Sequence, residues 1–359
     1  MKINVKNTLI EKYLSQKELN ILIANIYNSY LEECPLEINE NSIKEFSKTN
    51  NPIYYAFLKA LDIDYDDYEF SRLAKEYHVN EFKELPLEEY ENNPYYKNIH
   101  IEEHKYKKWT LGYSSYAPYQ CFLYDELDIN PKDFYKEISK FGYFKEEFKY
   151  LEVKEGDTTW MSITPHEINT MKEDIKKVKG NVLVLGLGLG YFPYMASLNN
   201  EVNKIVIIEK DKNIIELFKD ELLPKFNTNK IEIIHSDALV YLKNIKEHFD
   251  YVYCDLYHNA NDGLPLYLKV NKFEAKLKST TFLYWIEESI LALLRRYVLT
   301  IFEENLNGYT FKDYLDRSNF DNALLSDLFN YLRDKNFTSR EEIESLLSSK
   351  NLKNLAKSL

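Results

Sequence analysis

Three glycines within five positions follow an apolar run in the segment NVLVLGLGLGYFPY, residues 181–194. Glycine lets a chain turn tightly and brings its backbone close to a ligand. Gly186, Gly188 and Gly190 therefore predict a strand-to-helix turn whose free N–H groups face a carboxylate or a phosphate. Glu209 follows the next apolar run, twenty-three residues after Gly186, a spacing typical of a carboxylate that accepts the hydroxyls of a ribose.

Further polar side chains follow the third and fourth apolar runs of this region. Asp237 comes directly after IEIIHS and has the chemistry to accept a hydrogen bond from an exocyclic adenine amine. Asp255, Tyr257 and His258 come after YVYC. Because ligands of parallel sheets bind at the carboxyl ends of the strands, we expect these residues to share one cleft that suits a nucleoside.

The segments between these residues alternate between strand-like and helix-like patterns. VLVL, KIVII, IEIIH and YVYC have the length of buried strands, whereas KNIIELFKDELL and ALVYLKNIKEH carry helical spacing. This alternation predicts an α/β fold with a Rossmann-like, doubly wound and mostly parallel sheet. Only one further strand, TTFLYWI, follows Asp255, so we expect either a shortened sheet or one completed by strands from earlier in the chain.

The patterns divide the chain into four parts. Residues 1–108 are predicted to form an N-terminal helical domain, 109–163 a β connector, 164–305 the ligand-binding domain and 306–359 a C-terminal helical tail. Thr164, Pro165 and Glu167 predict a capping box at the start of a helix, which assigns Glu167 to the cap and the neighbouring His166 to the surface. Thr338 and Glu341 predict a second capping box in the tail.

The glycine spacing separates this loop from two common phosphate-binding motifs. A dinucleotide fingerprint would need glycine at the position of Tyr191, and a P-loop would need Gly-Lys-Ser/Thr. The stretch from about Trp160 to Ile286 resembles class I S-adenosylmethionine (SAM)-dependent methyltransferases. The resemblance rests on VLVLGLGLG, IVIIEKD, IEIIHSDA and FDYVYCDLY, which stand in the order and spacing of that family.

This resemblance implies SAM as the cofactor of residues 164–305 and a role for each strand end. The glycine loop would hold the methionine end of SAM, Glu209 the ribose, and Asp237 with Ala238 the adenine. The implied cofactor-binding residues are Gly186, Gly188, Gly190, Glu209, Asp237, Ala238 and Asp255.

Three positions indicate which branch of this family the sequence resembles most. Val184 stands where many members have an acidic residue, and this brings the loop closer to the spermidine synthase branch. That branch has an acidic residue between the second and third loop glycines and a second aspartate three positions after the strand-four aspartate. This chain has Leu189 and His258 there. We therefore expect a methyltransferase with a spermidine-synthase-like core, with polyamine-type aminopropyl transfer as an alternative.

Methyl transfer to a hydroxyl or an ammonium group needs a base in addition to alignment and exclusion of water. The predicted catalytic residues are Asp255 and His258, either of which has the chemistry of a base, and Tyr257, which would shape the acceptor pocket. The acceptor, a small molecule or a protein side chain, is left open. A protein that binds SAM or another nucleoside without transferring a methyl group is a further alternative. Four aromatic residues are candidates to line the acceptor side or to fill core: Trp109, Tyr113, Tyr116 and Tyr119.

Composition limits the partners. The formal net charge of −12 and pI of about 5.3 argue against a nucleic-acid partner. Three cysteines without CxxC spacing fit a reducing cytosol, and no apolar run reaches the roughly eighteen residues of a membrane span, so we expect a cytoplasmic protein that does not bind membranes. HIEEH, residues 100–104, matches a metalloprotease pattern but lies among charged residues, and we expect no metal site. The oligomeric state is left open.

Overall fold

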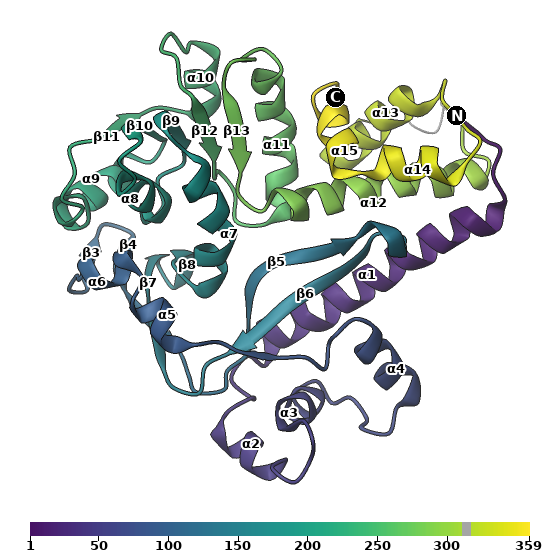
Figure 1. Ribbon diagram of the computed structural model, residues 1–359, viewed down its shortest axis with the longest axis horizontal. Coiled ribbons are helices and arrows are strands. Elements are labelled where there is room, and N and C mark those ends of the chain that lie inside the picture. Colours follow the sequence, from purple (N-terminus) through teal and green to yellow (C-terminus); the bar gives the residue numbers. More distant parts are fainter. Residues whose placement is uncertain (311–316) are drawn as a thin grey trace.

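The computed structural model describes residues 1–310 and 317–359 and contains a parallel five-stranded sheet, which lies at the upper left of Figure 1. The strand order is β11-β10-β9-β12-β13, so the chain moves outward from β9 in one direction and then returns to add β12 and β13 on the other side. This reversal creates a switch point between β9 and β12, where such sheets bind ligands. The strands are β9 (Gly180–Leu185), β10 (Val202–Glu209), β11 (Ile231–His235), β12 (Tyr251–Cys254) and β13 (Thr281–Tyr284).

The predicted fold class is confirmed, and the sheet is the shortened one. The sequence of β9 is a continuous apolar run because Val182 through Leu185 are buried on both faces of the sheet.

The predicted capping box is also present: Thr164 caps the helix that begins at Pro165, and the side chain of Glu167 accepts from the Thr164 N–H at 3.2 Å. The helices that connect the strands are α7 (Pro165–Lys177), α8 (Tyr191–Ser197), α9 (Lys212–Glu221), α10 (Ala238–Lys243) and α11 (Ala260–Glu274).

The connector, together with two short strands that precede it, builds two separate sheets instead of extending the parallel one. One is antiparallel, in the order β3-β4-β7-β8, and the other has the order β2-β6-β5. Gly156, at φ 60°, lies in the turn between β7 and β8. The strands are β2 (Lys83–Glu84), β3 (His104–Tyr106), β4 (Trp109–Tyr116), β5 (Phe122–Asn130), β6 (Lys136–Tyr143), β7 (Phe148–Glu155) and β8 (Thr158–Ser162).

Helix α1 and the C-terminal helices pack together at one end of the molecule. The long helices α1 and α12 contact each other, and Lys2 of β1 pairs with Asn336 of β14, so segments from both ends of the chain lie side by side (Figure 1). The elements are β1 (Lys2–Ile3), α1 (Asn7–Glu33), α2 (Glu40–Glu45), α3 (Pro52–Ala60), α4 (Tyr68–Glu76), α5 (Leu87–Glu91), α6 (Pro94–Asn98), α12 (Glu287–Leu306), α13 (Phe320–Leu332), β14 (Asn336–Phe337), α14 (Arg340–Leu347) and α15 (Ser349–Ala356).

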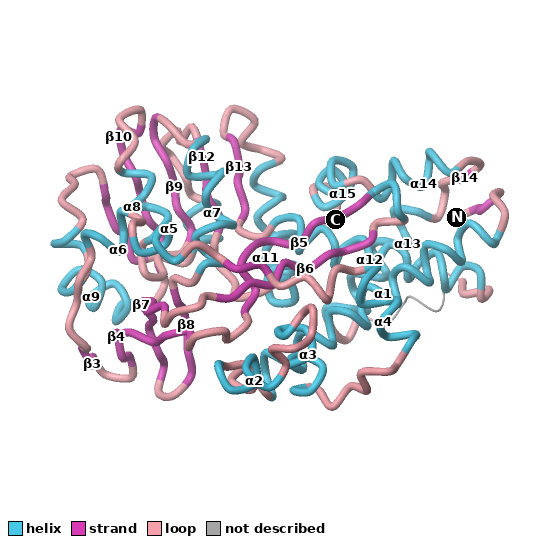
Figure 2. Tube along the Cα trace, turned by 60° about the horizontal axis from the view of Figure 1, so that its bottom comes forward, coloured by secondary structure: helices cyan, strands magenta, loops and turns pink. Residues whose placement is uncertain are grey.

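Two hydrophobic cores hold these parts. The larger core runs continuously from α1 through the connector and the parallel sheet into the C-terminal helices. A smaller core lies among α1, α3, α4 and β6, and the backbones of these elements are neighbours in Figure 2. The predicted cap of the C-terminal segment is wrong by one residue: α14 begins at Arg340, so Ser339 is the cap and its hydroxyl accepts from the N–H of Glu342. The four-part division at residues 108, 163 and 305 stays a prediction.

The described part of the chain contains neither a membrane-spanning helix nor a cluster of metal-binding side chains. None of its helices combines the length and the apolar character that crossing a membrane requires. It also contains no group of three or more His, Cys, Asp or Glu side chains placed to hold a metal ion.

Candidate active site

A cleft of about 510 Å³ lies at the carboxyl ends of β9, β10, β11 and β12. This volume falls in the range of small-molecule sites, roughly 300–1,000 Å³. Its walls combine loops of the parallel sheet with β8 and the start of α7. The predicted residues that line it are Gly186, Gly188, Glu209, Asp237, Ala238, Asp255, Tyr257 and His258.

Two glycines let the loop after β9 lie against neighbouring strands. Gly186 has φ 96°, and a Cβ there would lie 2.0 Å from the backbone oxygen of Asp255. Gly188 has φ 51°, and a Cβ there would lie 2.0 Å from the sulfur of Met161. The loop is thus held between the end of β12 and the β8 strand, with its backbone forming the floor of the cleft.

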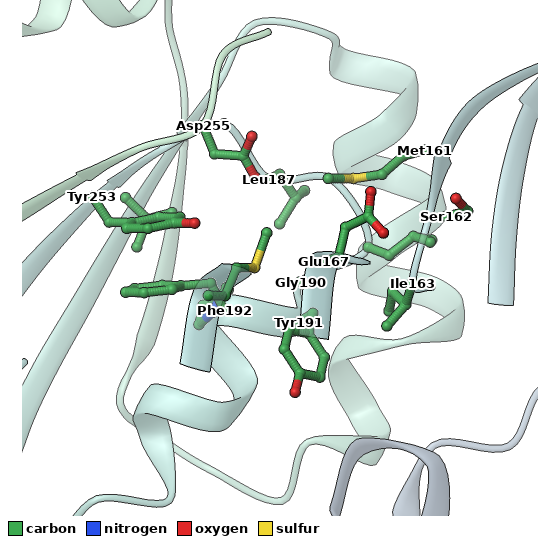
Figure 3. Close-up of a pocket in the computed structure, with 15 residues that line it drawn as sticks. Met161, Ser162, Ile163, Glu167, Leu187, Gly190, Tyr191, Phe192, Tyr253 and Asp255 are labelled. Carbon is green, nitrogen blue, oxygen red and sulfur yellow. The ribbon is translucent and has the colours of Figure 1, made fainter. Parts of the chain in front are cut away.

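Gly190 lies behind this floor. It precedes α8, and a Cβ there would lie 2.5 Å from the ring of Phe218. Gly190 is not among the residues that line the 510 Å³ cleft; it borders a space of about 10 Å³ next to it. Figure 3 shows this inner space, with Met161 and Leu187 at its boundary toward Asp255.

The backbone of the loop fixes the carboxylate of Glu209 at the end of β10. Its Oε2 accepts from the N–H of Leu187 at 3.2 Å, and its Oε1 accepts from the N–H of Asp211 at 2.7 Å. A carboxylate offers about four acceptor positions, so two bonds leave capacity for further donors. Glu209 is therefore oriented toward the cleft and still able to accept the two hydroxyls of a ribose.

Asp237 closes the far end of the cleft, beyond β11. One of its oxygens accepts from the N–H of Val240 at 2.9 Å and so caps α10, as a residue in this position commonly does. Its side chain is exposed and lines the cleft together with Ala238. Capping orients the carboxylate, and the second oxygen remains an acceptor for a ligand.

A pair of carboxylates occupies the inner part of the cleft. Asp255 keeps some accessible surface toward the cleft, yet protein atoms surround its carboxyl, and this loss of water raises its pKa from 3.8 to about 8. The negative charge of Glu167 is the second cause of this rise. Figure 3 shows both side chains directed into the same space from opposite walls. Glu167 therefore belongs to the cleft as well as to the capping box.

Tyr257 and His258 have different surroundings. Tyr257 is buried and its hydroxyl donates to the backbone oxygen of Trp285 at 2.6 Å, so its ring forms a wall while its polar end is held by the protein. His258 lies at the exposed mouth, where its Nδ1 is 3.0 Å from Asp262 Oδ2 and its ring meets the edge of Trp160. Of the two predicted bases, Asp255 is the one shielded from water.

Replacing Tyr257 by phenylalanine separates a structural role from a catalytic one. The change removes one buried hydrogen bond and leaves the ring in place, so we expect the free energy of unfolding to fall by about 1–2 kcal/mol. Turnover should change less than two-fold, because the hydroxyl faces the Trp285 carbonyl. Urea unfolding and steady-state rates measure the two quantities. A large loss of turnover at unchanged stability would instead place the hydroxyl in the chemistry.

All three tryptophans of the chain line the cleft, although they come from distant segments. Trp109 and Trp160 pack edge to face across the connector hairpins, and the indole N–H of Trp285 donates to Thr170 of α7. The sequence reasoning missed Trp160 and Trp285. Trp285 directly follows the β13 run, so the strand-end rule that identified Asp255 would also have found it.

The other aromatic candidates and His166 lie elsewhere. Tyr116 stacks on Phe122 and Tyr119 stacks on Tyr143, while Tyr113 is exposed, so of the four aromatic candidates only Trp109 lines the cleft. His166, predicted to lie at the surface, is half-buried. Its ring packs against Trp285, and burial lowers its pKa below the usual 6.5, because α7 turns this side of its first turn toward β13.

Comparison with known proteins places the α/β part of the chain. Residues 167–271 match the family described as the spermine/spermidine synthase domain. This stretch contains the glycine loop, Glu209, Asp237 and Asp255, and it confirms the predicted resemblance to class I SAM-dependent enzymes with a spermidine-synthase-like core. This part of the chain therefore falls in the superfamily of SAM-dependent methyltransferases and aminopropyltransferases. No curated protein matches the sequence.

Solved structures share parts of the fold. A PRMT1 enzyme–prozyme complex with AdoHcy from Trypanosoma brucei is 17% identical over 32% of this chain and 36% of that chain, with a TM-score of 0.26. Spermidine synthase from Thermotoga maritima is 12% identical over 55% and 71%, with a TM-score of 0.29. A spermidine synthase in complex with the transition-state analogue AdoDATO is 13% identical over 52% and 66%, with a TM-score of 0.30.

Proposed function

We propose that the protein is a SAM-dependent methyltransferase that acts on an amine acceptor. The observation that carries the proposal is one continuous cleft with two chemically different ends. The end beside β10 and β11 presents Glu209 and Asp237, which suit a nucleoside. The end beside β12 and β13 presents Asp255, Glu167 and tryptophans, which suit a cation.

The end of the cleft beside β10 and β11 offers hydrogen-bond donors and acceptors that match those of SAM. The backbone of the loop at Gly186 and Gly188 faces the cleft without side chains in the way. Glu209 would hold the ribose and Asp237 the adenine, each with acceptor capacity left after its internal hydrogen bonds. When bound, SAM supplies an electrophilic methyl carbon attached to a sulfonium sulfur.

The acceptor end fits a positively charged amine better than a neutral or anionic group. The carboxyl groups of Asp255 and Glu167 line this end of the cleft, and an ammonium group with its three donors matches them. Trp160 and Trp285 add aromatic rings, whose faces attract cations. An anionic acceptor would be repelled by Glu167 and, once the pH passes about 8, by ionised Asp255 as well.

Asp255 supplies the proton acceptor that an ammonium substrate needs. An amine attacks only through a free lone pair, so one proton must leave the nitrogen before transfer. The pKa of Asp255, raised to about 8, makes its carboxylate a stronger base than an exposed aspartate. Glu167 would hold the cationic form in place, and the buried ring of Tyr257 helps to exclude water.

Calorimetric titration with SAM and S-adenosylhomocysteine, with NAD as a control, tests the cofactor half of the proposal. Wild-type protein should bind the first two with micromolar affinity. Glu209→Gln and Asp237→Ser should each weaken binding by about ten-fold, or roughly 1.4 kcal/mol, because each removes a carboxylate while serine still caps α10.

Glu232→Gln is the matched control, since Glu232 is exposed on β11 and pairs with Lys204 outside the cleft. It removes the same charge and should leave the affinity unchanged. Folded wild-type protein that bound neither nucleoside would overturn the proposal. Binding without turnover across a panel of amines would favour the alternative of a non-catalytic SAM-binding protein.

Aminopropyl transfer is the second candidate, and the match of residues 167–271 to the spermine/spermidine synthase domain favours it. It predicts tighter binding of decarboxylated SAM than of SAM. Leu189 and His258 stand where that branch has acidic residues, which supports methyl transfer. Titration with both forms of the cofactor distinguishes the two reactions, because only an aminopropyltransferase should prefer the form without the carboxylate.

A further inference from the structure

A short segment of the N-terminal part contacts the glycine loop from the side opposite the cleft. Tyr95, in α6, is fully buried, and its hydroxyl donates to the backbone oxygen of Leu189 at 2.6 Å. Leu189 stands between Gly188 and Gly190, so this hydrogen bond reaches the centre of the loop. The family match begins at residue 167 and does not include this contact.

The peptide that joins Leu189 to Gly190 is thereby held at both ends. Its carbonyl oxygen accepts from Tyr95, and its N–H donates to the backbone oxygen of Leu187 at 3.0 Å. Peptides beside glycines in the left-handed region rotate at little steric cost, and Gly188 and Gly190 have φ 51° and 72°. The hydrogen bond from Tyr95 is what the surrounding protein adds to fix this orientation.

Asn93 holds the next residue of the loop. Its Nδ2 donates to the hydroxyl of Tyr191 at 2.8 Å, and its Oδ1 accepts from the N–H of Tyr95 at 2.9 Å, which caps α6. Asn93, Tyr95 and Tyr191 are all buried, so water does not replace these bonds. The segment of residues 93–95 therefore forms hydrogen bonds with the residues on both sides of Gly190, Leu189 and Tyr191.

We propose that Tyr95 and Asn93 are positioning residues for the cofactor loop, through which the N-terminal part of the chain sets the affinity for SAM. The inference rests on the proposed function, because it assumes that the loop binds SAM. Without the Tyr95 hydroxyl, the buried Leu189 carbonyl would lack a partner. Rotation of the 189–190 peptide would relieve that cost, but it would break the hydrogen bond from the Gly190 N–H to the Leu187 oxygen and so change the conformation of the loop whose Gly186, Leu187 and Gly188 line the cleft.

Tyr95→Phe tests the inference, with Tyr194→Phe as the matched control. Tyr194 is also buried, and its hydroxyl bonds Asn98 and Pro94, so it joins α6 to α8 without touching the loop carbonyl. Both variants lose one buried phenol hydroxyl and should lose similar free energy of unfolding. Tyr95→Phe should weaken SAM binding by about ten-fold, whereas Tyr194→Phe should bind as the wild type does.

Calorimetry for SAM and urea unfolding of each ligand-free variant provide the two readouts. Equal SAM affinities of Tyr95→Phe and wild type would overturn the inference, as would equal losses in both variants, which would show a general effect of stability. Absence of SAM binding in the wild type would instead overturn the proposed function. A variant Asn93→Asp, which keeps the cap of α6 and removes the donor to Tyr191, should also weaken SAM binding.

Discussion

Asp255→Asn is expected to lower the rate of methyl transfer by about 10²–10⁴-fold, the usual contribution of a positioned base. Asparagine has nearly the same shape and accepts no proton at neutral pH. Because Glu209 and Asp237 hold the nucleoside in the proposed complex, the affinity for SAM should remain close to that of the wild type. Single-turnover rates and calorimetry on the same preparation measure both quantities. His258→Gln, at the exposed mouth, serves as the comparison and should retain most of the rate.

The pH dependence supplies an independent check on the role of Asp255. As a base it must be ionised, so kcat/KM should rise with pH until about pH 8, the raised pKa of Asp255, and Asp255→Asn should remove that rise. A loss of rate in Asp255→Asn of only a few-fold, with the pH profile unchanged, would assign the proton transfer to another group.

Asp255 should also make the protein less stable as pH rises. Between pH 3.8 and about 8 the folded state keeps a proton on Asp255 that the unfolded state has released. Stability therefore falls with pH across this window. The contribution of Asp255 is fully present below 3.8 and is lost as pH passes about 8. Urea midpoints measured at several pH values should decline less steeply in Asp255→Asn than in wild type.

Gly186→Ala is expected to have the largest effect on stability, with a loss above about 3 kcal/mol. Gly186 has φ 96°, where alanine is strained, and the new Cβ would lie 2.0 Å from the backbone oxygen of Asp255. A backbone atom of a central strand has no rotamer through which to move away, so the loop or the end of β12 must shift.

Gly156→Ala is the matched control for this prediction. Gly156 also has a positive φ, of 60°, but a Cβ there would meet no atom within 4 Å. Gly156→Ala should lower the free energy of unfolding by about 1–2 kcal/mol, the penalty of placing alanine in the left-handed conformation. Thermal or urea unfolding of the two variants separates strain from collision. Similar losses in both would contradict the close packing of the Gly186 loop on β12.

The sequence by itself determined the local and periodic features of this protein. Each strand of the parallel sheet followed from a short apolar run, and the cap at Thr164 followed from local backbone chemistry. Glu209, Asp237 and Asp255 were found because strand ends meet at one edge of a parallel sheet. These features depend on residues near one another in the chain.

Only the tertiary structure decided which distant segments complete the cleft. The three tryptophans meet there from separate parts of the chain, Glu167 of α7 faces Asp255 after β12, and Tyr95 of α6 reaches the carbonyl of Leu189. Such contacts join residues that are about a hundred positions apart in the sequence. A capping residue or a buried tyrosine has the same local sequence pattern whether or not its side chain reaches a binding site. Tertiary packing, and not local propensity, therefore decides which of these residues contribute to the cleft.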